Sequence, residues 1–172
     1  MIITDTEICN PSVPNLPTKA KVEQLCRQKG PHYNRLVYIA NGSKFFIKYN
    51  NARIAEAHAQ LFFYLQIKQT LNSSFYVPEI YHAWLTDRGA TYIVMEYIDV
   101  DHFASDEQRA RAITELISVP PPQGVFGSFW QRGKIRHPFF KDREAYKKHL
   151  TVGELQDSVN NVRASSIQLN LM

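Results

Sequence analysis

The chain has 172 residues, of which 44% are hydrophobic and 21% are charged, and its net charge is +4. This composition can bury a core, which excludes a wholly disordered protein, and the length suits one domain or a small domain with an appendage. Two cysteines are too few for a disulfide scaffold, and no apolar run approaches the length that spans a bilayer. No signal peptide is recognisable at the N-terminus, so we expect a cytoplasmic protein without a membrane segment.

Residues 1–30 are predicted to form an irregular N-terminal arm. Prolines at positions 11, 14 and 17 interrupt this part of the chain, and few apolar positions recur with a helical or strand period.

A β-hairpin is predicted over residues 35–49. Asn41 and Gly42 supply the two positive φ angles that a type I′ turn requires, and apolar strands flank them. A two-residue turn fixes the register, which places Tyr38 opposite Phe45, Leu36 opposite Ile47, and Val37 opposite Phe46. Both faces of the hairpin are apolar, so we expect both to be covered and Lys48 to lie on a largely buried surface.

The following elements predict an α+β fold, with an antiparallel sheet and one helix on its face. Apolar positions 54, 57, 61, 62 and 65 indicate a helix, with Asn50 or Asn51 as its cap. Two strands follow at 80–86 and 91–98, joined by a turn at 87–90.

Two capping boxes predict later helices. One runs from Ser105 to Gln108 and opens a helix that ends at three prolines, 120–122, and the other runs from Thr151 to Glu154. We therefore divide the chain into the arm, a lobe at 31–99, and a region at 100–172 with a proline-rich link at 119–124.

The positive charge is concentrated between Arg132 and Lys148, where seven basic residues stand against two acidic ones. Such a run, with aromatic residues interleaved, can bind nucleic acid. A solvated helix face is the commoner cause, and the rest of the chain is nearly neutral, so we do not predict a nucleic-acid partner.

Lys48 and Glu56 are the strongest candidates for chemistry. A lysine at the end of an apolar strand needs a carboxylate or a ligand phosphate if it is buried, and Glu56 lies on the next predicted helix. In phosphoryl-transfer enzymes such a lysine holds nucleotide phosphates and the glutamate orients it. The alternative is a strand-end lysine whose ammonium extends into water.

Four stretches resemble the aminoglycoside phosphotransferase and choline-kinase-like family, most of all its large fungal branch, which has the protein-kinase-like fold. They are Phe45–Tyr49, Glu56, Val77–Tyr81 and Tyr92–Ile98, in the order seen in that family. Later stretches up to Asn160 also resemble that branch. The resemblance implies a kinase-like N-lobe at 31–99 and the first helices of an incomplete C-lobe at 100–172.

The resemblance also implies a site for ATP with Mg²⁺. Lys48 matches the lysine that holds the phosphates, and Glu56 matches its partner on the helix. The residues that match adenine-contacting positions are Glu96, Tyr97 and Ile98 in the hinge, and Val37 and Phe46 in the slot. Phe46 departs from the family pattern, because a small residue is usual there and a phenyl ring can fill the slot.

The catalytic half of the family motif is absent from this sequence. None of the six histidines is followed two residues later by an aspartate, and Asp99 and Asp101 are expected in a solvated turn. We therefore predict no catalytic and no metal-binding residue, and interpret the chain as a truncated or degenerate ATP-binding lobe of a small-molecule phosphotransferase, inactive alone.

Two alternatives remain open. The chain can be a pseudokinase-like interaction module that docks a protein partner, or associates with itself, through an apolar cleft face comprising Val37, Ile39, Phe46 and Met95. It can also be the incomplete product of a full-length small-molecule kinase.

Overall fold

The computed structural model describes residues 1–70, 72–100, 102–120, 147, 151 and 153–157. The chain divides into two compact units, Met1–Pro120 and Pro121–Met172. The division lies inside the segment predicted as a proline-rich link, at 119–124. Helix 106–118, which we assigned to the second region, therefore belongs to the first unit together with residues 1–30.

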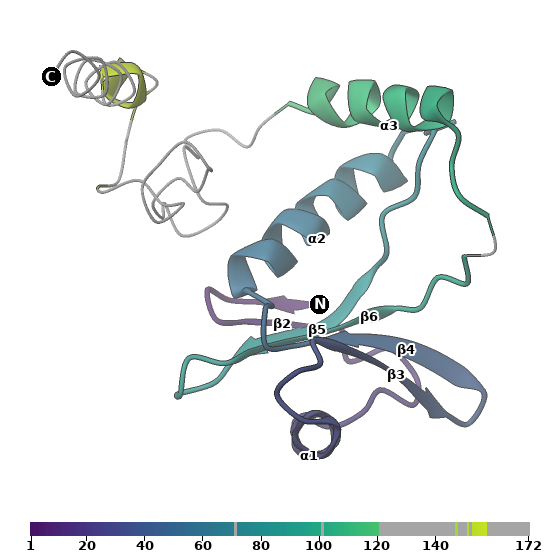
Figure 1. Ribbon diagram of the computed structural model, residues 1–172, viewed down its shortest axis with the longest axis vertical. Helices are drawn as coiled ribbons and strands as arrows, with labels where there is room; N and C mark the ends of the chain where they lie inside the picture. The colour runs from purple at the N-terminus through teal and green to yellow at the C-terminus, as the bar shows by residue number, and fades with distance from the viewer. Residues whose placement is uncertain (71, 101, 121–146, 148–150, 152, 158–172) are drawn as a thin grey trace, which may run out of the picture. The chain divides into compact units, whose positions relative to one another are not determined.

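The first unit contains one six-stranded antiparallel sheet and three helices (Figure 1). The strands are β1 (Ile2–Ile3), β2 (Glu7–Cys9), β3 (Arg35–Ala40), β4 (Ser43–Lys48), β5 (Ile80–Leu85) and β6 (Thr91–Glu96), and the helices are α1 (Lys19–Lys29), α2 (Ile54–Lys68) and α3 (Asp106–Ser118). The order across the sheet is β1-β2-β5-β6-β4-β3. The predicted α+β class is confirmed.

The hairpin of β3 and β4 has the register that its two-residue turn predicts. Val37 pairs with Phe46 and Tyr38 with Phe45. The turn residues have positive φ angles, 47° at Asn41 and 80° at Gly42, as a type I′ turn requires.

Helices cover both faces of the sheet, since α1 and α2 lie on opposite sides of it (Figure 1). On one face, α2 packs onto the sheet; the buried residues there include Ala57, Leu61, Ile80, Ala83 and Ile93. On the other face, Val22 and Cys26 of α1 join Phe45, Ile47 and Val94. The sequence predicted only one covering helix, because only two of the eleven residues of α1 are buried and its polar residues obscure the pattern.

The prediction of an irregular arm at 1–30 was wrong. This segment contains β1, β2 and α1, and β2 adds to the sheet beside β5. The prolines precede the helix, which begins after Thr18, where the Thr18 hydroxyl oxygen accepts a hydrogen bond from the Lys21 amide at 3.3 Å. Gly30, with φ of 96°, ends it.

The predicted cap of α2 was also wrong. Arg53 is the N-cap residue and makes no side-chain capping bond. Asn50 instead adopts a positive φ of 59° and donates from Nδ2 to the carbonyls of Pro31 (3.1 Å) and Tyr33 (2.6 Å). Leu65, one of the apolar positions that indicated this helix, is 41% exposed, whereas Tyr64 is buried.

The two predicted capping boxes both form N-terminal turns. Ser105 and Gln108 exchange reciprocal hydrogen bonds at the start of α3. In the second unit, the Thr151 hydroxyl accepts from the Glu154 amide at 3.2 Å, ahead of a short helix at 153–157. The basic run at 132–148, apart from Lys147, lies outside the described residues.

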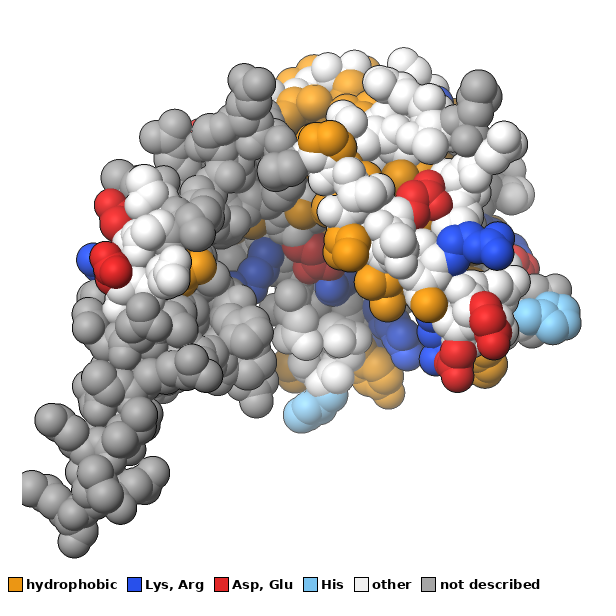
Figure 2. Space-filling model, turned by 90° about the horizontal axis from the view of Figure 1, so that it is seen from above, with side chains coloured by type: hydrophobic (Ala, Val, Ile, Leu, Met, Phe, Trp, Pro, Cys, Tyr) orange, Lys and Arg blue, Asp and Glu red, His pale blue; other side chains and the backbone are white. Residues whose placement is uncertain are grey.

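Helix α3, described throughout, buries none of its side chains. Ile113 and Ile117 are 59% and 77% exposed, and Figure 2, seen from above Figure 1, shows hydrophobic side chains on the upper surface of the unit. Two hydrogen bonds from Ser74 to the Glu115 carboxylate join α3 to the segment after α2. Within the described part of the chain, no helix combines the length and hydrophobicity needed to cross a bilayer.

Candidate functional site

Lys48 and Glu56 form an ion pair on the sheet face that α2 covers. Lys48 is the last residue of β4, and Glu56 lies in the first turn of α2, so the short connection between these elements brings them together. The Lys48 ammonium donates to Oε1 of Glu56. The side chains are 30% and 38% exposed, so a ligand can reach a pair that the protein has already oriented. The predicted pair is therefore present, and the ammonium is directed at a carboxylate rather than only at water.

Arg35 is a second cation beside this pair. It is the Cα partner of Lys48 in the ladder between β3 and β4, and directly opposed residues project from the same face of a sheet. Arg35 is exposed. Arg35 was not among the predicted site residues, although the predicted hairpin register already placed residue 35 opposite residue 48. Two cations and one carboxylate leave a positive excess at this edge of the sheet.

The predicted adenine slot is a strip of apolar residues across three strands. Val37, Phe46 and Met95 are successive Cα partners on β3, β4 and β6. Met95 is 7% exposed, Phe46 is half-buried against the core under α2, and Val37 is 46% exposed. With Ile39 63% exposed as well, the prediction that both hairpin faces are covered was wrong: α2 covers only the β6 end of this face.

The hinge residues follow β6, and their side chains have protein partners. Oε2 of Glu96 accepts hydrogen bonds from the Tyr76 hydroxyl and from the Glu79 amide, the latter at 3.2 Å. The hydrogen bond to the Glu96 carboxylate is the main cause that raises the pKa of Tyr76. The Glu96 amide also donates to the Glu79 carbonyl at 2.9 Å. The Glu96 side chain and amide therefore join β6 to the segment before β5.

Tyr97 and Ile98 are more accessible than Glu96. The Lys44 ammonium lies 5.1 Å from the centroid of the Tyr97 ring, and Ile98 is 39% exposed. Lys44 also pairs with Asp99 at 3.5 Å, and the Asp99 side chain is 79% exposed, as a solvated turn predicts. Asp101 lies outside the described residues.

A cavity of about 470 Å³ lies beside the hinge residues Glu96 and Tyr97. Phe45 and Tyr81, which also line it, belong to the face that α1 covers. The structure thus brings Lys48, Glu56 and the slot residues together on the α2 face, whereas the cavity beside the hinge opens on the other face.

No family model, curated protein or solved structure matches the chain.

Proposed function

We propose that this chain is the nucleotide-binding lobe of an aminoglycoside-phosphotransferase-like protein and binds Mg-ATP through Lys48. The observation that carries the proposal is the ion pair of Lys48 with Glu56 at the end of β4. A lysine fixed by a helix glutamate is the arrangement that holds nucleotide phosphates in kinase-like proteins. The succession of hairpin, helix and hairpin that the sequence pattern predicted also supports it.

The charges around Lys48 fit a polyphosphate. Arg35 and Lys48 stand opposite each other, and Glu56 compensates only one of them. A phosphate bound to the Lys48 ammonium would lie on the sheet face from which Arg35 also projects, and charge-assisted hydrogen bonds to a lysine and an arginine are among the stronger polar contacts in proteins. Glu56 orients the ammonium before the ligand arrives, which reduces the entropy that binding removes.

Adenine would lie on the strip formed by Val37 and Phe46, with the backbone of residues 96–98 as hydrogen-bonding groups. The Phe46 ring occupies the middle of this strip. We therefore propose weak binding, in which the phosphate contacts supply most of the affinity. Mg²⁺ would be bound by the phosphates of the nucleotide, because we assign no metal ligand at this site.

The proposal covers binding of nucleotide and does not extend to transfer by these residues. No histidine in the sequence is followed two residues later by an aspartate. Phosphoryl transfer needs such a carboxylate to position the acceptor hydroxyl.

A thermal-shift titration of the full chain with Mg-ATP tests this function. A ligand at about 100 times its Kd stabilises a folded protein by about 2.7 kcal/mol, which raises the Tm of a domain of this size by several degrees. We expect such a rise in the wild type and in Lys21→Ala, which removes an exposed lysine on α1. Lys48→Ala should abolish it. An equal rise in Lys48→Ala, or none in the wild type, would reject the proposal.

The second candidate is an interaction module, favoured by the exposure of Val37 and Ile39 on the edge strand β3. Exposed apolar side chains on an edge strand favour contact with another chain. Sedimentation velocity over a range of concentrations would show self-association that Ile39→Lys removes, whereas a protein partner leaves the isolated chain monomeric. In both cases Mg-ATP would leave the Tm unchanged.

A further inference from the structure

Three side chains with metal-ligating atoms converge on β2 and β5, at the opposite face of the sheet from Lys48. Cys9 is the Cα partner of His82, and Glu7 lies two residues before Cys9, so all three project from the same face. One ligand atom from each lies within 4.8 Å of the others. His82 is 7% exposed, and Glu7 and Cys9 are half-buried.

The Glu7 carboxylate is oriented so that one oxygen faces this cluster. Its Oε2 pairs with the Lys19 ammonium of α1 at 2.8 Å, and its Oε1 lies 2.9 Å from Nε2 of His82. The His82 ring in turn packs against Trp84, with a centroid separation of 4.8 Å. Lys19 can therefore keep its contact while Oε1, Nε2 and the Cys9 sulfur turn toward a common centre.

We propose that Glu7, Cys9 and His82 bind a single zinc ion. Carboxylate oxygen, thiolate sulfur and imidazole nitrogen are all zinc ligands, and three protein ligands with a water molecule complete a tetrahedral site. Tetrahedral zinc holds sulfur and nitrogen ligands about 3.5 Å apart, so the Cys9 sulfur needs to approach by at most about 1.3 Å, while Oε1 of Glu7 and Nε2 of His82, now 2.9 Å apart, move slightly apart. On binding, the Cys9 thiol releases its proton to water, and the proton that Nε2 of His82 donates to Oε1 of Glu7 leaves that nitrogen, so that Nδ1 carries the ring proton once Nε2 binds zinc.

Such an ion would fasten the N-terminal strands to the centre of the sheet. β1 and β2 have two and three residues, and Ile8 is the one residue of these strands that is fully buried in the core. A metal bond between β2 and β5 stabilises the folded state over an unfolded chain in which His82 is far from Glu7 and Cys9.

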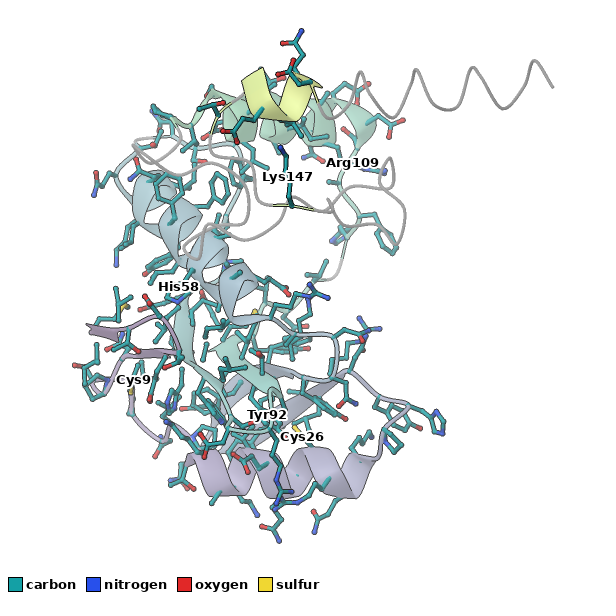
Figure 3. The ribbon with its side chains drawn as sticks, turned by 90° about the vertical axis from the view of Figure 1, so that its left-hand side faces the viewer. Cys9, Cys26, His58, Tyr92, Arg109 and Lys147 are labelled. Atoms are coloured by element: carbon teal, nitrogen blue, oxygen red, sulfur yellow. The ribbon has the colours of Figure 1, made fainter. Side chains whose placement is uncertain are left out.

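Titration of the reduced, metal-free full chain with Co²⁺ tests the site. A tetrahedral site with a thiolate gives a sulfur-to-cobalt charge-transfer band and strong visible d–d bands, both of which Zn²⁺ should remove by displacement. The expected result is one Co²⁺ per chain, with the charge-transfer band absent in Cys9→Ser. Cys26→Ser is the matched control, because Cys26 is buried on α1, away from β2 (Figure 3).

The variants Glu7→Gln and His82→Asn test the other two ligands. Losing even a group that only orients a metal ligand lowers affinity by about 10- to 100-fold, so each variant should weaken Zn²⁺ binding at least tenfold. Circular dichroism shows whether each variant folds. If the variant of the buried His82 does not fold, the variants of Glu7 and Cys9 test the site, because these two residues are only half-buried. No charge-transfer band in the wild type, or a band that persists in Cys9→Ser, would overturn the proposal.

Discussion

The interaction free energy between the Lys48 and Glu56 side chains measures whether the fold holds this ion pair in place at the candidate site. A double-mutant cycle with Lys48→Met, Glu56→Gln and the double variant isolates the interaction free energy from other effects of each substitution. The favourable position of Glu56 in the first turn of α2 is one such effect, and it cancels because it is lost in both legs of the cycle.

The expected interaction free energy follows from how exposed the two side chains are. Fully exposed ion pairs contribute about 0.2–1 kcal/mol, and breaking a buried pair costs about 3–5 kcal/mol. With side chains about one-third exposed, the Lys48–Glu56 coupling should lie near the upper end of the first range, at about 1 kcal/mol. Lys44, which lies on the same strand as Lys48, and Asp99 provide a control pair with side chains 49% and 79% exposed, and should couple by about 0.3 kcal/mol.

Urea denaturation of the wild type and of the three variants of each cycle, at low salt and at about 1 M NaCl, measures both couplings. Salt reduces the Debye length from about 10 Å to about 3 Å, so the exposed control pair should lose its coupling and the Lys48–Glu56 pair should retain part of it. A Lys48–Glu56 coupling no larger than that of Lys44–Asp99 would show that the pair is not held in place by the fold, and would refute the reasoning.

Three further outcomes are expected. Burial lowers the pKa of His58 below 6.5, although Asp5 opposes the shift, so the unfolded chain takes up a proton first as the pH falls. The free energy of unfolding should therefore fall as the pH drops below 6.5, and it should fall less in His58→Gln. An equal fall in the variant would contradict the assignment to His58. Burial raises the pKa of the Cys26 thiol to about 12, so Ellman's reagent should modify one thiol, Cys9, in the native metal-free protein and a second only on unfolding. Gly42→Ala places a side chain on a residue with φ of 80°, a conformation that is strained for alanine, and should lower the free energy of unfolding by about 1 kcal/mol in urea denaturation. An unchanged urea midpoint would show that the turn does not impose this strain.

The hairpin and the ion pair could be predicted because their determinants are local. Asn41 and Gly42 set the turn type, which sets the register, and the register places each residue of β3 opposite one of β4. Glu56 follows Lys48 by eight residues, across a connection too short to place α2 far from the end of β4. The same local logic applies to Arg35, which the register alone places beside Lys48.

The N-terminal strands could not be predicted because their partners are distant in the sequence. β2 has three residues, too few for alternation to be recognised, and it pairs with β5 more than 70 residues later, where Cys9 meets His82. The polar character of α1 conceals the contribution of Val22 and Cys26 in the same way. Short elements that pair with residues far away in the sequence produce only a weak periodic pattern in the local sequence.

The two proposed sites can be tested independently, because they lie on opposite faces of the sheet. Side chains alternate between faces along a strand, so Lys48 and Phe46 face α2, whereas His82 shares its face with Trp84 and α1. Cys9→Ser should therefore leave the response to Mg-ATP intact, and Lys48→Ala should leave the cobalt spectrum intact. If Cys9→Ser removed both responses although its circular dichroism matched the wild type, the sheet would not separate the sites, and the assignment of side chains to faces would be wrong.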